Sequence, residues 1–452
     1  MSRTLLFKGA RVIDATAGAD AIGDVYVRDG VLSRKRIEDE RADAVYDCRG
    51  LVLCPAFVDL HCHLREPGGE RKETVASGTA AAAAGGFGSV CAMPNTRPAY
   101  DSVQNAEMAE TQHSEGARVH VYRIAAVTEG RAGKKLVDID ALAEHGVVGF
   151  SDDGDYLQDA ALMRDALIAA SRHRLPVMDH AQDNGLVKGG VMHQGEISRL
   201  LGVGGMPPEA EELAVARDIA LARLTGGHMH ICHITTARSL EMVRVARAEG
   251  VHVTAEVTPH HLMLTDEDAQ TSGKSGTAAF NNDAKVNPPL RGRADTRALL
   301  RGLADGTIDA IATDHAPHAP EDKSGSPDEA AFGISGFETA LAVVVTLCDG
   351  GVLTIERAIE ALTTGPVRVL AGHGPKAGLV EGSAAEFVLF DPNVTWKVDA
   401  SAFLSRGKNT PLNGRTLRGR VLTTFVNGAP AYWRDVLESR LTSGTPAAHP
   451  PQ

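Results

Sequence analysis

The chain has 452 residues, of which 43% are hydrophobic and 23% are charged, and its formal net charge is −12. This composition is ordinary for a globular protein, and the length leaves room for a large core and more than one domain. The acidic balance argues against nonspecific binding to nucleic acid, because a polyanion would be repelled.

The sequence carries no mark of a membrane or a secreted protein. No uninterrupted apolar stretch approaches the length of a membrane span, and the first residues lack the apolar core of a signal peptide. The six cysteines form no Cys-x-x-Cys pair, so neither a zinc knuckle nor a disulfide framework is indicated. We therefore expect a cytoplasmic enzyme with a small-molecule substrate, and neither nucleic acid nor membrane as a partner.

Short apolar runs separated by turn residues occupy both ends of the chain. "TLLFKGARVI" and "GDVYVRDGVL" lie near the start, and "AEFVLFDP" and "RGRVLTTFVNGAP" lie near the end. Such runs are typical of short β-strands. We predict that residues 1–54 and 376–452 together form a small β-sandwich domain, which the chain leaves and then re-enters.

Eight strand-like runs alternate with helical stretches between these ends. In order they are "AFVDLHCH", "GSVCAMPN", "HVYRIAAV", "GVVGFSDD", "LPVMDH", "GHMHICHI", "VHVTAEVTPH" and "IDAIATDH". This alternation predicts an α/β fold in which residues 55–375 form a (β/α)8 barrel of the TIM type. A doubly wound sheet also fits, but polar residues follow the ends of many strands, and barrels carry their chemistry at that end.

The first of these runs continues into "VDLHCHLREPG". Side chains two apart on a strand point the same way, so His61 and His63 share a face and Cys62 points away. Two neutral imidazoles on one face suit a metal ion. An isolated His-x-His pair is often a coincidence, so a metal site needs further ligands from the rest of the chain.

Further histidines end other strands. His180 ends "LPVMDH", where it could also cap a helix. In "GHMHICHITT", alternation places Met229, Ile231 and His233 on one face. We expect that face to point into the barrel, which makes His233 the ligand and His230 a packing residue on the helix side.

Two stretches add carboxylates. In "VVGFSDDGD", either Asp152 or Asp153 could bridge two cations or simply form a turn, and spacing does not choose between them. Asp314 ends the last strand, where a carboxylate near a metal could shuttle a proton. The set reads two His, Asp, His, His and Asp in chain order, which is enough for two divalent ions of the zinc type.

These blocks resemble the amidohydrolase superfamily and, more narrowly, bacterial dihydroorotases of the long, type I class. The resemblance spans nearly the whole chain and rests on "VDLHCHLREPG", "MPNTRP", "FSDDG", "PVMDH", "HICHITT", "AEVTPHHL", "KVNPPLR" and "ATDHAPH". It implies two zinc ions per subunit, bridged by Asp153 and a hydroxide. The metal-site residues that it implies are His61, His63, Asp153, His180, His233 and Asp314, and Asp314 is also the implied catalytic acid/base.

The implied reaction is the reversible cyclisation of N-carbamoyl-L-aspartate to (S)-dihydroorotate and water in pyrimidine biosynthesis, by a zinc-bound hydroxide. Arg65 would hold the substrate carboxylate, unless it forms an ordinary salt bridge to Glu66 or Glu70. The expected partners are the substrate, a second copy of the chain in a homodimer, and aspartate carbamoyltransferase. The substrate contacts that the resemblance implies are His63, Arg65, Asn95, Asn287, His318, Phe332 and Gly333.

Two other functions remain open. Hydantoinases, dihydropyrimidinases and allantoinases belong to the same superfamily but usually bridge their metals with a carbamylated lysine, and residues 146–156 contain no lysine. A non-catalytic dihydroorotase-like partner of aspartate carbamoyltransferase would have lost metal ligands, and this chain keeps all of them. The chain departs from the family at Ala181 and Gln182, where relatives commonly have Cys-Glu. The polar stretch 319–331 is either a solvated connection or a cover over the substrate.

Overall fold

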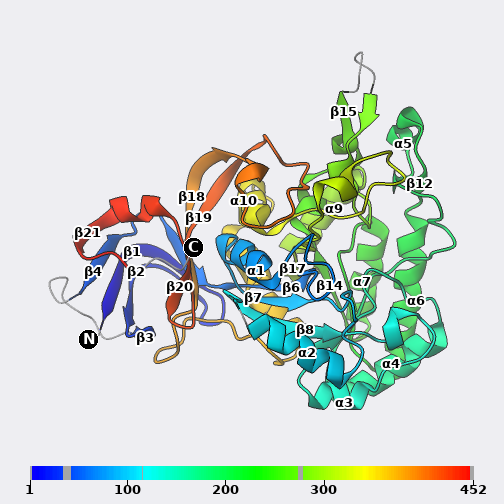
Figure 1. The fold of residues 1–452 in the computed structure, drawn as a ribbon, viewed down its shortest axis with the longest axis horizontal. Helices are drawn as coiled ribbons and strands as arrows, with labels where there is room; N and C mark the ends of the chain where they lie inside the picture. The colour runs from blue at the N-terminus through cyan, green and yellow to red at the C-terminus, as the bar shows by residue number, and fades with distance from the viewer. Residues whose placement is uncertain (1–2, 34–41, 115, 273–277, 448–452) are drawn as a thin grey trace.

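The computed structural model describes residues 3–33, 42–114, 116–272 and 278–447. Figure 1 shows two parts, with a sheet at the left and a barrel surrounded by helices at the right. The blue strands of the sheet come from the start of the chain and the orange and red strands from its end. The chain therefore leaves the sheet, builds the barrel and returns.

The sheet contains nine strands and joins both ends of the chain. Its order is β20-β19-β18-β5-β1-β2-β3, with β4 paired to β1 and β21 paired to β4. Strand β5 pairs in parallel with β1 and antiparallel with β18, which connects the two ends. The strands are β1 (Thr4–Asp14), β2 (Ala19–Arg28), β3 (Val31–Ser33), β4 (Ala44–Asp47), β5 (Val52–Pro55), β18 (Phe387–Lys397), β19 (Thr416–Val426), β20 (Ala429–Trp433) and β21 (Leu441–Gly444).

Aromatic side chains hold this sheet together from strands far apart in the sequence. The ring of Phe7 stacks on Tyr46 at 5.4 Å and meets the edge of Phe387 at 5.1 Å. All three side chains are fully buried, so their packing adds both apolar burial and ring contacts. The mixed sheet built from both termini agrees with the prediction, while the domain boundaries at 54/55 and 375/376 stay a prediction.

Eight parallel strands form the predicted barrel, in the order β17-β14-β13-β10-β9-β8-β7-β6. The barrel is nearly closed between β17 and β6, because the Asp59 carboxylate accepts hydrogen bonds from Thr313 N and Oγ1, both at 2.7 Å. A parallel bridge between Cys62 and His315 lies beside these bonds. The strands are β6 (Phe57–Cys62), β7 (Phe87–Ala92), β8 (His120–Ala125), β9 (Gly149–Phe150), β10 (Val177–Asp179), β13 (Met229–Ile231), β14 (Val253–Val257) and β17 (Ala310–Ile311).

Helices cover the outside of the barrel, and several begin at a side chain that accepts backbone hydrogen bonds. Thr74, Asp159 and Thr236 cap the helices that follow them in this way. None of the helices in the described ranges is both long and apolar enough to cross a membrane. The helices are α1 (Val75–Ala84), α2 (Val103–Ser114), α3 (Ile139–Glu144), α4 (Ala160–Arg172), α5 (Glu196–Leu201), α6 (Glu209–Thr225), α7 (Ala237–Ala248), α8 (Pro259–Met263), α9 (Arg293–Ala304), α10 (Phe337–Cys348), α11 (Ile355–Leu362) and α12 (Thr364–Val369).

Two two-stranded sheets lie outside the main sheet and the barrel. Strands β11 (Met192–His193) and β12 (Gly205–Met206) pair in parallel, and β15 (Gln270–Ser272) and β16 (Ala278–Phe280) pair antiparallel. The loops that follow β6, β9, β10, β13 and β17 lie at the carboxyl end of the barrel. Because parallel strands end at the same rim, residues far apart in the sequence meet there.

Candidate active site

The Asp153 carboxylate lies between four imidazole rings at the carboxyl end of the barrel. Its Oδ2 is 3.3 Å from His61 Nε2 and 3.5 Å from His63 Nε2. Its Oδ1 is 3.4 Å from His180 Nδ1 and 3.5 Å from His233 Nε2. Each oxygen thus faces one pair of histidines, which is the arrangement that a carboxylate shared by two metal ions requires.

The spacing and the unpaired atoms of this cluster fit metal ions of the zinc type. Two ligands that bind a tetrahedral zinc at about 2.0–2.1 Å lie about 3.3–3.4 Å from each other. Within the described residues, no hydrogen-bond partner is found for two buried atoms of the cluster, His61 Nε2 and Asp153 Oδ1. Buried polar atoms without partners are unfavourable, and bound cations would satisfy them.

Asp314 faces the same cluster from the end of β17. Its Oδ1 is 3.0 Å from His63 Nε2 and 3.6 Å from His61 Nε2. Burial raises the pKa of the Asp314 carboxyl, but His63 and His61 outweigh burial and hold that pKa well below its usual range. The pKa of Asp153 is likewise held low, because His61, His180 and His233 outweigh its burial. Both carboxylates are therefore ionised at neutral pH.

Hydrogen bonds on the side of each ring that faces away from Asp153 orient His61 and His63. The Nδ1 of His61 lies 2.9 Å from Glu256 Oε1, and the Nδ1 of His63 lies 2.9 Å from Asn95 Oδ1. Since both oxygens accept, each Nδ1 carries a proton, which leaves each Nε2 able to offer a lone pair to a cation when one is bound. Glu256 was missed in the sequence, where its one signal is a carboxylate inside the apolar run "VTAEV" of β14.

The predicted orientation of β13 is wrong. Met229 and Ile231 point outward and belong to the hydrophobic core between the barrel and its covering helices. His230 points inward instead, where its Nε2 lies 3.1 Å from Glu256 Oε2. His230 therefore helps to hold the carboxylate that orients His61. His233 still reaches the site because β13 ends at Ile231 and the chain then turns, with φ of 32° at His233.

Left-handed backbone conformations recur at the predicted site residues. Arg65 has a φ of 62° and Asp314 a φ of 44°, in addition to His233. Residues other than glycine seldom adopt positive φ, and such strain clusters at functional sites, where the surrounding structure enforces it. The turns explain why strict alternation along a strand does not predict the direction of side chains just past its end.

The two neighbouring aspartates have different surroundings. The Asp152 carboxylate accepts hydrogen bonds from Val127 N at 2.9 Å, from Thr128 N at 3.0 Å and from the Thr128 hydroxyl. Asp152 thus joins the ends of two barrel strands, while Asp153 faces the histidines. The sequence left this choice open, and the resemblance pointed to Asp153.

All predicted substrate contacts line one cavity of about 480 Å³ beside the cluster. Arg65 reaches it with no carboxylate within salt-bridge distance in the described ranges. Glu66 and Glu70, its predicted alternative partners, instead accept from the backbone N–H groups of Val75 and Gly68, both at 2.7 Å. Burial lowers the pKa of Arg65 to about 10, so the guanidinium remains charged at neutral pH. The predicted substrate contacts in this lining are His63, Arg65, Asn95, Asn287, His318, Phe332 and Gly333.

Comparison with known proteins gives the family. A family model described as "Dihydro-orotase-like" matches residues 50–239. A dihydroorotase from Anaeromyxobacter dehalogenans (strain 2CP-C) is 45% identical over 430 residues, which are 95% of this chain and 98% of the relative. A dihydroorotase from Pelotomaculum thermopropionicum is 45% identical over 426 residues, covering 94% and 97%. The chain belongs to the dihydroorotase family.

Solved structures support the barrel of this dihydroorotase-family chain. An L-hydantoinase (dihydropyrimidinase) from Arthrobacter aurescens has a TM-score of 0.80 at 22% identity, covering 95% of this chain and 96% of the other. A D-hydantoinase (dihydropyrimidinase) from Thermus sp. has a TM-score of 0.81 at 22% identity, covering 95% of each chain. At such identity the likeness shows the fold alone. The predicted family, enzyme class and fold class are confirmed.

Asn409, which the sequence analysis missed, connects two loops of the cavity wall, residues 316–318 and 333–335. Its Oδ1 accepts from His318 N at 2.9 Å and from the Ser335 hydroxyl at 3.0 Å. Its Nδ2 donates to Ala316 O at 3.1 Å and to Gly333 O at 2.9 Å. The residue is buried and uses all four of its side-chain hydrogen bonds, so it holds both loops in register.

Lys323 anchors the stretch that was predicted to cover the substrate. Its Nζ donates to the carbonyls of Lys285 at 3.1 Å, Ala331 at 2.8 Å and Gly333 at 3.1 Å. This buried lysine fixes the middle of residues 319–331 to the cavity wall, so the stretch is more than a solvated connection. That it moves over the substrate stays a prediction.

Proposed function

We propose that this chain catalyses the dihydroorotase reaction, the reversible ring closure of N-carbamoyl-L-aspartate to (S)-dihydroorotate with loss of water. The observation that carries the proposal is the single carboxylate of Asp153 at 3.3–3.5 Å from four histidine nitrogens, beside a cavity that holds Arg65. The identity of 45% to dihydroorotases over nearly the whole chain supports the choice of substrate.

The donor set of the site suits two zinc ions, one held by His61, His63 and Asp153 and the other by Asp153, His180 and His233. Nitrogen and carboxylate ligands without thiolate are typical of catalytic zinc. When bound, the ions would polarise the substrate carbonyl and lower the pKa of water to roughly 7.

Asp314 is the group that moves the proton. In the hydrolytic direction, the water oxygen bonds to the ring carbonyl carbon and the bond from that carbon to the ring nitrogen breaks. Asp314, ionised beside His63, accepts the proton released by the water and returns it to the departing nitrogen. In ring closure the same carboxylate works in the opposite order.

Arg65 and the loop residues hold the substrate in place. A guanidinium presents a planar fork that matches a carboxylate with two hydrogen bonds. His318 lies beside Arg65 in the cavity wall, where its Nε2 donates to Phe332 O at 2.8 Å and lies 3.5 Å from the Arg65 guanidinium. Asn287 lines the same wall and donates to the Tyr156 hydroxyl.

The test combines metal analysis of the purified protein with assays on dihydroorotate and dihydrouracil. We expect about two zinc ions per chain and turnover of dihydroorotate, with dihydrouracil a poor substrate because it lacks the carboxylate. Asp314→Asn should keep its metals and lose about 10²–10⁴-fold in kcat. Equal turnover of dihydrouracil, or a near-wild-type rate in Asp314→Asn, would contradict the proposal.

We also propose that the enzyme forms a homodimer, associates with aspartate carbamoyltransferase and has a cytoplasmic location. Light scattering of the purified chain alone and with that transferase tests the first two.

A further inference from the structure

A second cavity of about 480 Å³ adjoins the catalytic one. The two share Arg65, Asn95 and Gly154 in their linings. The second lining holds four more cationic side chains and one carboxylate, that of Glu70, although the chain as a whole has a net charge of −12. The four further cations are Arg71, Lys72, Arg97 and Arg131.

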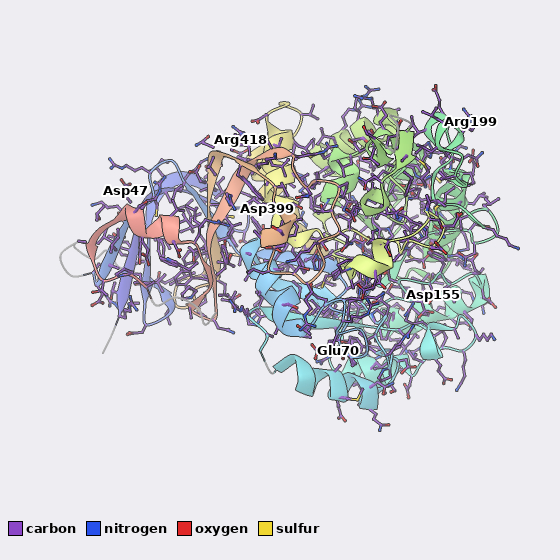
Figure 2. The ribbon with its side chains drawn as sticks, turned by 45° about the horizontal axis from the view of Figure 1, so that its top comes forward. Asp47, Glu70, Asp155, Arg199, Asp399 and Arg418 are labelled. Atoms are coloured by element: carbon purple, nitrogen blue, oxygen red, sulfur yellow. The ribbon has the colours of Figure 1, made fainter. Side chains whose placement is uncertain are left out.

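Some of these cations have carboxylate partners. Arg131 donates to Asp155, which is labelled in Figure 2. Arg71 pairs with both Glu321 and Asp322. Their positive charge is therefore largely balanced.

The positive charges of the three remaining cations, Arg65, Lys72 and Arg97, are less well balanced by carboxylates. Within the part of the chain that the structure describes, Lys72 has one carboxylate within salt-bridge distance, that of Asp322 at 3.8 Å, and Arg71 binds the same carboxylate at 2.6 Å. Across the described ranges, neither Arg65 nor Arg97 has a carboxylate within salt-bridge distance. The cavity thus holds more positive charge than its own carboxylates balance.

The cations lie close enough to repel one another. Burial lowers the pKa of Lys72, and Arg65, Arg71 and Arg97 lower it further, with Asp322 opposing them. A bound anion would relieve this repulsion. The loop also needs glycine for Arg97 to approach, because a Cβ at Gly68, where φ is +87°, would lie 2.6 Å from the Arg97 Cβ and carbonyl oxygen.

We propose that this second cavity is a capture site for the anionic substrate, in which Lys72 and Arg97 attract its carboxylates before Arg65 receives them. The inference rests on the proposed function. N-carbamoyl-L-aspartate carries two carboxylates and dihydroorotate one, so both enter through the same positive field. Because Arg65 lines both cavities, it is the point at which the carboxylate passes from one to the other.

The variants Arg97→Gln and Lys72→Gln test this role. The control is Arg301→Gln, which removes the same charge from an exposed position on α9 outside both cavities. At low salt, we expect kcat/KM to fall about 3- to 10-fold in the first two variants, mainly through KM, and to stay unchanged in the control. The factor must be the same in both directions of the reaction, because a variant cannot alter the equilibrium constant.

Salt and a conservative substitution separate charge from shape. The difference from wild type should shrink toward 0.5 M KCl, roughly where the screening length falls below 5 Å. Arg97→Lys should retain most of the wild-type kcat/KM, because it keeps the charge. Zinc content and Tm, measured on every variant, identify any that fail to fold.

Two results would overturn the capture site. One is wild-type kcat/KM at low salt in both Arg97→Gln and Lys72→Gln with intact metal content. The other is an equal loss in Arg301→Gln, which would reduce the effect to net charge. If the wild-type enzyme turned over neither N-carbamoyl-L-aspartate nor dihydroorotate, the proposed function itself would be wrong.

Discussion

Asp152 and Asp153 are adjacent in the chain, yet their carboxylates lie in different surroundings. Asp153→Asn should lower the zinc content and nearly abolish turnover, because an amide is a poorer metal ligand than the carboxylate that faces the four histidines. Asp152→Asn should keep the zinc and lose about 1–3 kcal/mol of stability, since it weakens the bonds to Val127 and Thr128. Metal analysis and thermal unfolding measure both. The reverse pattern would move the bridging role to Asp152.

Arg65 is the residue that we expect to choose the substrate. Arg65→Met should lose about 2–4 kcal/mol in kcat/KM for dihydroorotate, as for a broken charged pair, while zinc content stays normal. Arg65→Lys should raise KM, because a point charge does not reproduce the planar fork. Steady-state kinetics with metal analysis checks both variants. Loss of zinc in Arg65→Met would mean that the side chain supports the metal site rather than the substrate.

The segment between β18 and β19, residues 398–415, contacts the loops of the barrel site through Asn409. Asn409→Asp would place a carboxylate oxygen opposite the carbonyls of Ala316 and Gly333, which now accept hydrogen bonds. We expect KM for dihydroorotate to rise about 10-fold and Tm to fall, with kcat and zinc content much less affected. A change in kcat alone would contradict this role.

The matched control for Asn409 is Asn413→Asp in the same segment. The Asn413 Oδ1 accepts from Ala400 N at 3.0 Å, and an aspartate retains that acceptor. Its KM should therefore equal that of the wild type. A rise in KM in the control as large as that in Asn409→Asp would show that any added charge in the segment disturbs the loops.

For the whole molecule, the metals should act as a clamp between strand ends. Ions that bind the folded chain and not the unfolded one stabilise it by about 2.7 kcal/mol when the free ion is at 100 times its Kd. Chelation should therefore lower Tm, and added zinc should restore it. His233→Ala should respond less to chelation than the wild type. An unchanged Tm on complete removal of zinc would contradict a clamp.

Sequence alone determined the elements and the kinds of chemistry. The alternation of strands and helices predicts the barrel because buried parallel strands and covering helices have distinct patterns. The period of two along β6 correctly places His61 and His63 on one side, since His61 lies on the strand and His63 directly follows its last residue. The resemblance supplied the metal ligands and the substrate contacts, which spacing could not.

Tertiary structure alone decided what lies past the strand ends and between distant segments. The turn at His233 and the inward position of His230 depend on where β13 stops, which its alternating pattern does not encode. The contacts of Glu256 with His61 and of Asn409 with His318 join residues 195 and 91 positions apart. No local pattern records such contacts, because they follow from barrel closure and from the return of the chain across its rim.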